Sequence, residues 1–183
     1  MSRARTIANF GDGLVTADLP SDLGIVGGDL PTGSVLQVVS AVNNNYQEVS
    51  STTYTDTATT ASITPSATSS KILIIVHGTL TSIRASESIW ANLRIYRNST
   101  SNLVYVADYF NNISAGTDAI GENKYANGFS INHLDSPSST SATTYTLQIA
   151  TGTTSNSGRV RLSNSTSGQN TNLSNITLME IAG

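Results

Sequence analysis

Hydrophobic residues recur at every second position through most of the chain, from Ser34 to the C-terminus. A spacing of two is the period of a β-strand, in which successive side chains point to opposite faces. Gly, Asn, Asp and Pro residues, which favour turns, separate the runs. The pattern predicts about ten strands and no helix, at residues 35–39, 46–55, 61–63, 71–76, 89–96, 103–110, 125–131, 145–149, 160–162 and 176–178. Such a series is typical of an all-β, antiparallel sandwich or barrel.

Individual runs predict different environments. The run Lys71–Val76 is apolar on both faces, which predicts a central strand covered on both sides. The run Ile89–Tyr96 alternates between apolar and polar residues, as a half-buried strand does. Tyr46–Thr55 reads as one polar strand, and Ala61–Ile63 as the beginning of another before Pro65. The chain has few of the Lys and Pro residues that protect sheet edges, which hints that neighbouring copies cover them.

The first 33 residues differ in character from the rest. Their hydrophobic residues are thinly spread and are interrupted by Gly, Asp and Pro, so neither a helical nor a strand period persists. Such a segment buries too little apolar area to offset its loss of conformational entropy. We therefore predict an extended N-terminal arm at 1–33, ordered against a partner, and a β-sandwich domain at 34–183. An arm folded back on its own domain is the alternative.

Composition excludes several classes of protein. The net charge is −3 and charged residues make up 11% of the 183 residues, so the chain lacks the basic surface that nucleic-acid binding needs. No apolar run approaches the length of a membrane span. The chain has no cysteine, which excludes disulfides and thiolate chemistry. The N-terminus has basic residues but no apolar stretch, so we expect synthesis and folding in a reducing cytosol.

The sequence offers little catalytic chemistry. His77 and His133 stand alone in strand-like runs, where a packed histidine is the common outcome. No nucleophile elbow, zinc-protease helix or Walker loop is present. The carboxylates at 12, 18, 22 and 29 lack the spacing of a calcium loop and fit turn capping better. We therefore predict no enzymatic activity, no metal site and no cofactor.

Aromatic and basic residues supply the candidate contact sites. Trp90, Tyr96, Tyr109 and Tyr125 are candidates for a ligand or interface surface, because Tyr and Trp rings stack on sugars and also pack at subunit contacts. For Trp90 both interpretations stay open. Arg3 and Arg5 are the only basic residues among the first seventy, and they are suited to pairing with carboxylates of a partner protein or to lying in solvent.

Four segments resemble virion proteins of tailed bacteriophages, many of them tail-fibre or structural proteins of marine and cyanobacterial phages. In order along the chain, the segments are Met1–Asp12, Asp29–Val39, Ile63–Ile74 and Leu93–Arg97. In that group a short arm precedes a Pro-x-Gly-Ser-Val-x-Gln-Val-Val segment and an all-β domain. The resemblance spans most of the first hundred residues. Beyond Leu103 the sequence has only a general β pattern.

The resemblance implies a homotrimeric spike or fibre of the virion with a jelly-roll-like sandwich. The arm would anchor it to other virion proteins, either a tail adaptor or the major capsid protein, through Arg3, Arg5, Ile7, Phe10 and Leu14. The β domain would project outward and meet a host surface glycan. The chain is short and lacks a shaft repeat, so a capsid decoration protein is a close alternative. A carbohydrate-binding module is a second class of function, and a glycan-degrading enzyme is the least favoured.

Overall fold

The chain forms an antiparallel β-sandwich, which confirms the predicted fold class. A computed structural model describes residues 30–84, 89–98, 102–113, 123–162 and 173–183, with backbone alone for 102–113, 123 and 124. Within these ranges there are ten strands and one short 3₁₀ helix, η4 (Ser155–Ser157). The strands are β1 (Val35–Asn43), β2 (Gln47–Val49), β3 (Thr55–Ile63), β4 (Lys71–Arg84), β5 (Ile89–Arg97), β6 (Asn102–Ile113), β7 (Asn123–Asp135), β8 (Thr143–Thr151), β9 (Arg159–Leu162) and β10 (Ser174–Ile181).

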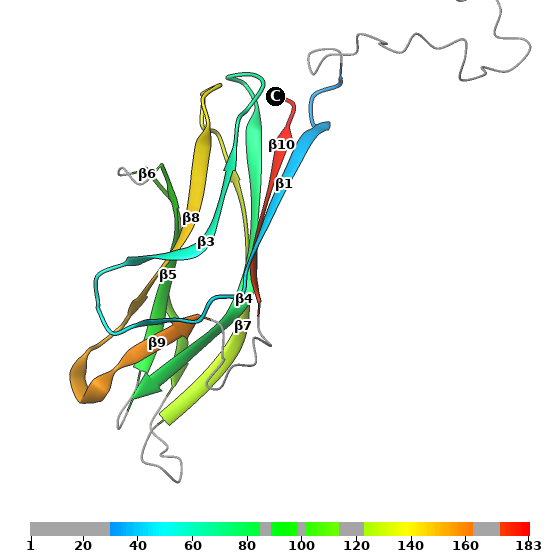
Figure 1. Cartoon of the computed structure of the whole chain (residues 1–183). Coiled ribbons are helices and arrows are strands. Elements are labelled where there is room, and N and C mark those ends of the chain that lie inside the picture. The colour runs from blue at the N-terminus through cyan, green and yellow to red at the C-terminus, as the bar shows by residue number, and fades with distance from the viewer. Residues whose placement is uncertain (1–29, 85–88, 99–101, 114–122, 163–172) are drawn as a thin grey trace, which may run out of the picture.

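The strands pair in a nested order, like one long hairpin folded upon itself. The first strand pairs with the last, β2 with β9, β3 with β8, β4 with β7, and β5 with β6. Folding this hairpin over gives two sheets, which face each other in Figure 1. Sheet A has the order β1-β10-β4-β7, and sheet B has the order β3-β8-β5-β6. This is the arrangement of a jelly roll.

The long central strand β4 organises sheet A. One of its edges pairs with β7 over nearly its whole length. Its other edge pairs first with β10 and then with β9, and β2 continues the sheet beyond β9. Sheet A therefore has an upper half, built on β1 and β10, and a lower half, built on β2 and β9 (Figure 1).

The core lies between the sheets and is filled mainly by alternate residues of the strands, although β4 from Leu80 and β8 from Leu147 are buried at every position to their ends. Fully buried side chains come from both sheets, and they include Ile72, Ile74, Val76, Leu93, Ile95, Leu147, Ile149, Ile176 and Leu178. The alternation in β5 is as predicted: Ile89, Ala91, Leu93 and Ile95 are buried, whereas the residues between them are half-buried. In β5, period-two patterning therefore identifies the face that forms the core.

Two of the predicted strands are wrongly placed, and several others extend beyond their predicted ends, as β4 does by continuing to Arg84. Tyr46–Thr55 is not one strand, because β2 ends at Val49 and the chain crosses to sheet B before β3. The Ser51 hydroxyl accepts a hydrogen bond from the Thr53 amide at 3.0 Å, a local turn that competes with strand pairing. Ala61–Ile63 is the end of β3 rather than the beginning of a strand.

The strand predicted to be covered on both sides is central, but the residues that the structure describes cover only one face of Lys71–Val76. Ile72, Ile74 and Val76 lie in the core, whereas Leu73 and Ile75 lie half-buried on the outer face of sheet A. Within the described residues of one chain, no second layer packs over this outer face.

A buried carboxylate closes the end of the sandwich where the chain passes into β1. Glu180 is 1% exposed and follows Ile176 and Leu178 on the inward face of β10. Its oxygens accept hydrogen bonds from Gln37 Nε2 at 2.6 Å, from the Ser66 amide and hydroxyl at 2.7 and 2.6 Å, and from Ser70 Oγ at 2.7 Å. Burial opposes ionisation, but the hydrogen bonds outweigh it and hold the pKa of Glu180 below its usual range. The carboxylate thereby ties the β3–β4 loop to β1 and β10.

We predict that Glu180→Gln lowers the free energy of unfolding by about 1–3 kcal/mol at neutral pH, because an amide cannot accept all of these bonds. A carboxyl whose pKa is lowered in the folded state stabilises the protein above its ordinary pKa of about 4.3, and this stability disappears as the pH falls through the folded-state value. The difference between wild type and variant in urea unfolding should therefore shrink below about pH 4. A difference that does not vary with pH would contradict this role.

Candidate functional surfaces

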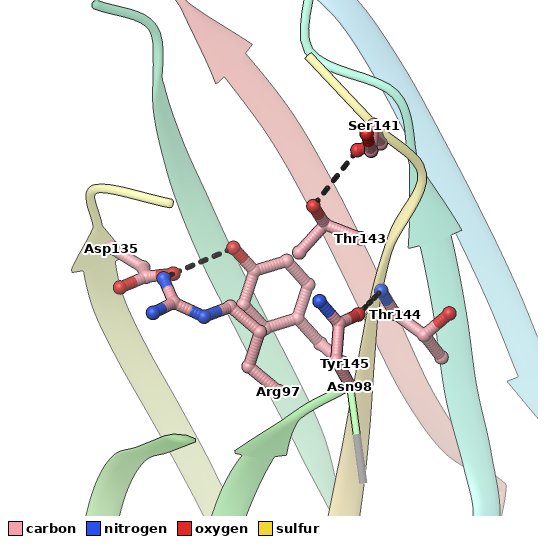
Figure 2. Close-up of polar contacts among 7 residues, drawn as sticks. All are labelled: Arg97, Asn98, Asp135, Ser141, Thr143, Thr144 and Tyr145. Atoms are coloured by element: carbon pink, nitrogen blue, oxygen red, sulfur yellow. Dashed lines mark hydrogen bonds and ion pairs between the residues drawn. The ribbon is translucent and has the colours of Figure 1, made fainter. Parts of the chain in front are cut away.

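A second carboxylate, which is half-buried, joins the two sheets at the same end of the molecule (Figure 2). Asp135 ends β7 in sheet A, and its Oδ2 lies 2.6 Å from Arg97 Nη1 and 2.7 Å from the Tyr145 hydroxyl. Arg97 ends β5 and Tyr145 lies in β8, so both partners belong to sheet B. The Arg97 and Asp135 side chains are 19% and 14% exposed, and Tyr145 is fully buried.

The electrostatics of this cluster make Tyr145 a permanent hydrogen-bond donor. Burial, followed by the hydrogen bond to Asp135 and its charge, raises the pKa of Tyr145 far above that of a free phenol. The neighbouring Asn98 extends the connection. Its backbone N–H donates to the Thr144 carbonyl, and its side-chain Oδ1 accepts from the backbone N–H of Thr144, both at 2.8 Å. Because the Tyr145 side chain is fully buried, the cluster stabilises the contact between the two sheets and exposes no reactive group.

Sequence reasoning did not identify Glu180, Arg97 or Tyr145 as special. A signal for each was present: every one of them continues the inward series of an alternating strand, where an apolar residue is the usual occupant. A polar or charged residue at such a position must find partners inside the protein. The partners come from other strands, and the sequence does not reveal which.

The outer face of sheet B contains Trp90 and Tyr96. Both are on β5 and point away from the core, together with Arg94 between them. The guanidinium carbon of Arg94 lies 4.1 Å from the ring centre of Tyr54 and 4.8 Å from that of Tyr96. Arg94 Nε donates to Gln148 Oε1 at 2.5 Å, and Gln148 Nε2 donates in turn to Asp56 Oδ1. This outer face is therefore covered by its own network of aromatic and polar side chains.

Trp90 lies against the residue that follows β8. Its indole packs on Gly152, where a Cβ would come within 2.0 Å of Nε1. Six residues along a strand separate it from Tyr96, a span of about 20 Å.

The structure therefore brings two of the four candidate aromatics onto one face and separates a third. Tyr125 lies on β7 in sheet A and is 47% exposed. Tyr109 falls in β6, and its side chain is outside the described part of the structure. The predicted anchoring residues Arg3, Arg5, Ile7, Phe10 and Leu14 also lie outside it.

The upper half of the outer face of sheet A has an apolar band. Four side chains stand in one row across four strands, because Val38 pairs with Met179, Met179 with Leu73, and Leu73 with Leu134. Val38 and Leu134, at the two edges of the row, are 55% and 49% exposed. Ile75, Ile181 and Val35 lie beside this row, and we call these seven residues the apolar band.

The lower half of the same face is charged. Glu48 Oε2 on β2 lies 2.5 Å from Arg161 Nε and 3.3 Å from Arg159 Nε, both on β9. The same oxygen accepts a hydrogen bond from the Tyr46 hydroxyl at 2.9 Å. Burial opposes ionisation of Glu48, but these partners outweigh it and lower its pKa. The lower half of this outer face is thus charged, whereas the upper half combines the apolar band with outward Ser, Thr and Asn side chains of β1 and β10 that hydrogen-bond to one another.

The two histidines do not form a site together. His133 pairs with the buried Ile74 and so belongs to the inward face of sheet A, whereas His77 is exposed on the outward face.

No group of His, Asp and Glu side chains suited to holding a metal ion occurs among the residues that the structure describes. In that same part of the chain, no helix has the length and apolar character to cross a membrane.

We predict that Asp135→Ala lowers the free energy of unfolding by about 3 kcal/mol, because it leaves the Arg97 guanidinium and the Tyr145 hydroxyl without their shared acceptor. Tyr145→Phe removes one hydrogen bond and keeps the ion pair, so it should cost only about 1 kcal/mol. Urea unfolding of the two variants measures both values. Equal losses in the two variants would show that the Arg97–Asp135 contact contributes nothing.

Comparisons with known proteins do not assign a family. A scan against protein-family models finds no match, and a search of curated proteins finds no similar sequence.

Proposed function

We propose that this chain is a non-enzymatic structural subunit of a bacteriophage virion. It acts as a homotrimeric short fibre or spike, anchored to the particle by residues 1–33, with the sandwich meeting the host surface. The observation that carries the proposal is the apolar band, because large contiguous apolar patches on a soluble protein mark contact with other proteins. The resemblance supplies the kind of assembly.

The residues behind the resemblance have a common structural task, which supports the proposal. Gln37 belongs to the segment Asp29–Val39, and Ser66 and Ser70 belong to the segment Ile63–Ile74. All three donate hydrogen bonds to Glu180. Gln37 also donates to the carbonyl of Thr64 at 2.7 Å. The two motifs thus build one end of the sandwich together, and their joint occurrence has a physical reason.

The junction between arm and domain is suited to transmitting load. The Ser34 amide donates to the Pro31 carbonyl at 3.0 Å, which closes a turn with Gly33 at a φ of +91°. The Gly33 amide donates to the Ala182 carbonyl, and the Ala182 amide donates to the Ser34 carbonyl, each at 2.8 Å. A pull on the arm therefore acts on β1 and β10 together, beside the central strand β4. A capsid decoration protein would need the same junction and remains the alternative within this class.

Carbohydrate binding is a second candidate, and the outer face of sheet B favours it. Trp90, Tyr54 and Tyr96 present aromatic rings there among amide, hydroxyl and guanidinium groups. Such a mixture of aromatic and polar groups suits the two faces of a sugar ring.

Removal of residues 1–29 tests the structural proposal. The truncated protein keeps every described contact of the domain, so it should remain folded with its oligomeric state unchanged. It should no longer co-sediment with particles assembled in its presence, whereas the full chain should. Normal incorporation of the truncated protein would overturn the anchoring role of the arm.

A glycan array with the full chain tests the second candidate. Saturable binding should be lost in Trp90→Ala and kept in Tyr125→Ala, which removes an aromatic ring from the other sheet. Absence of saturable binding by the wild type, or equal loss in both variants, would eliminate this surface as the binding site.

A further inference from the structure

We propose that three copies of this chain associate through the apolar band, with the outer faces of their A sheets turned toward a common axis. The inference rests on the proposed function, since it names the partner that covers the band. On β4 the outward residues Leu73 and Ile75 are apolar and half-buried, and the described part of the chain places no second layer over them. Leu73 stands between Met179 and Leu134, so the apolar row runs from one edge of the four-strand face to the other.

The width of the band decides what can cover it. Four strands at a spacing of about 4.8 Å make a face about 19 Å wide. A single extended segment, such as the predicted arm, covers about 5 Å of that width. Another sheet face covers all of it, because sheets pack face to face by interdigitating their side chains. A second copy of the chain presents such a face.

The charges of the face also favour identical partners. Lys71 is the one permanently charged side chain among the outward residues of β1, β10, the first half of β4 and the second half of β7. A face without carboxylates and with a single lysine gives no preference to an oppositely charged partner. Burying identical apolar surfaces against one another requires no charge pairing and gains about 25 cal/mol per Å² of apolar area. The charged cluster of Glu48, Arg159 and Arg161 marks where this contact ends.

The same dimensions accommodate three copies. Packed sheets lie about 10 Å apart, so inward side chains fill a space about 5 Å deep from each sheet. Three faces at about 5 Å from an axis close into a triangular prism when each is about 17 Å wide, which is close to the width of four strands. In that prism the β1 edge of one copy meets the β7 edge of the next. Val38 of each copy then lies beside Leu134 of its neighbour.

Engineered cysteines test this arrangement cleanly, because the chain has none of its own. We would oxidise the full chain carrying Val38→Cys and Leu134→Cys together, and separate the products under denaturing, non-reducing conditions. The prism predicts covalent trimers from the double variant and predominantly single chains from each single variant. Covalent dimers would overturn the three-fold arrangement. Single chains from the double variant would overturn the band as the contact surface.

The mass of the native assembly that Leu73→Lys forms provides a second test of this contact surface. Leu73 is half-buried in one chain, so we expect the variant to keep the circular dichroism spectrum of the folded protein while its native mass falls to one third. Ser62→Lys places the same charge on the exposed outer face of sheet B and should leave the mass unchanged. An unchanged mass for Leu73→Lys would contradict the proposal. If that variant fails to fold, the cross-linking result decides.

The proposed function can fail separately from this inference. Covalent trimers that do not join particles would remove the virion assignment and leave the contact surface in place. Particles that incorporate the protein as single chains would keep the virion assignment and remove the apolar band as the contact surface.

Discussion

Each strand of a two-sheet sandwich has two faces, and the core between the sheets can bury only one of them. That constraint determines how the rest of this molecule is arranged, because every outward side chain must be compatible with water or be covered by something else. On the outer face of sheet B, Arg94 lies between two tyrosine rings and is linked by hydrogen bonds through Gln148 to Asp56, so polar groups face the water there. The lower half of sheet A meets the same requirement with Glu48 and two arginines. The upper half of sheet A has the apolar band.

Two carboxylates, the buried Glu180 and the half-buried Asp135, give the upper end of the sandwich its defined geometry. Glu180 and Asp135 both pair with Ile72, from opposite sides, and so stand in one row across sheet A. One carboxylate is held by neutral donors from β1 and the β3–β4 loop, and the other by Arg97 and Tyr145 of sheet B. A register slip of one residue in either strand would move its carboxylate to the outer face and leave these donors unsatisfied. The end from which the arm departs is therefore fixed in register and tied to both sheets.

Period-two patterning was enough to predict the fold class, most strands and the inward face of β5. It failed where local turn chemistry interrupts a polar run, as at Ser51 and Thr53, because a strand of Thr and Ser has no apolar alternation to mark its ends. It also missed Glu180, Arg97 and Tyr145, whose partners lie on strands far away in the sequence. The apolar character of Lys71–Val76 on both faces was recognised, but the pattern cannot tell whether the same chain or another copy covers the second face. Strand order follows from long-range pairing, which no local pattern encodes.

Thiol reactivity measures directly whether the apolar band is covered in the assembled protein. A single cysteine at position 73 would lie under the cover, whereas one at position 62 would lie on the outer face of sheet B. In the full, folded chain, the account predicts that a maleimide reacts far more slowly at position 73 than at position 62, and that mild denaturation removes the difference. Equally fast reaction at the two positions in the folded protein would contradict it.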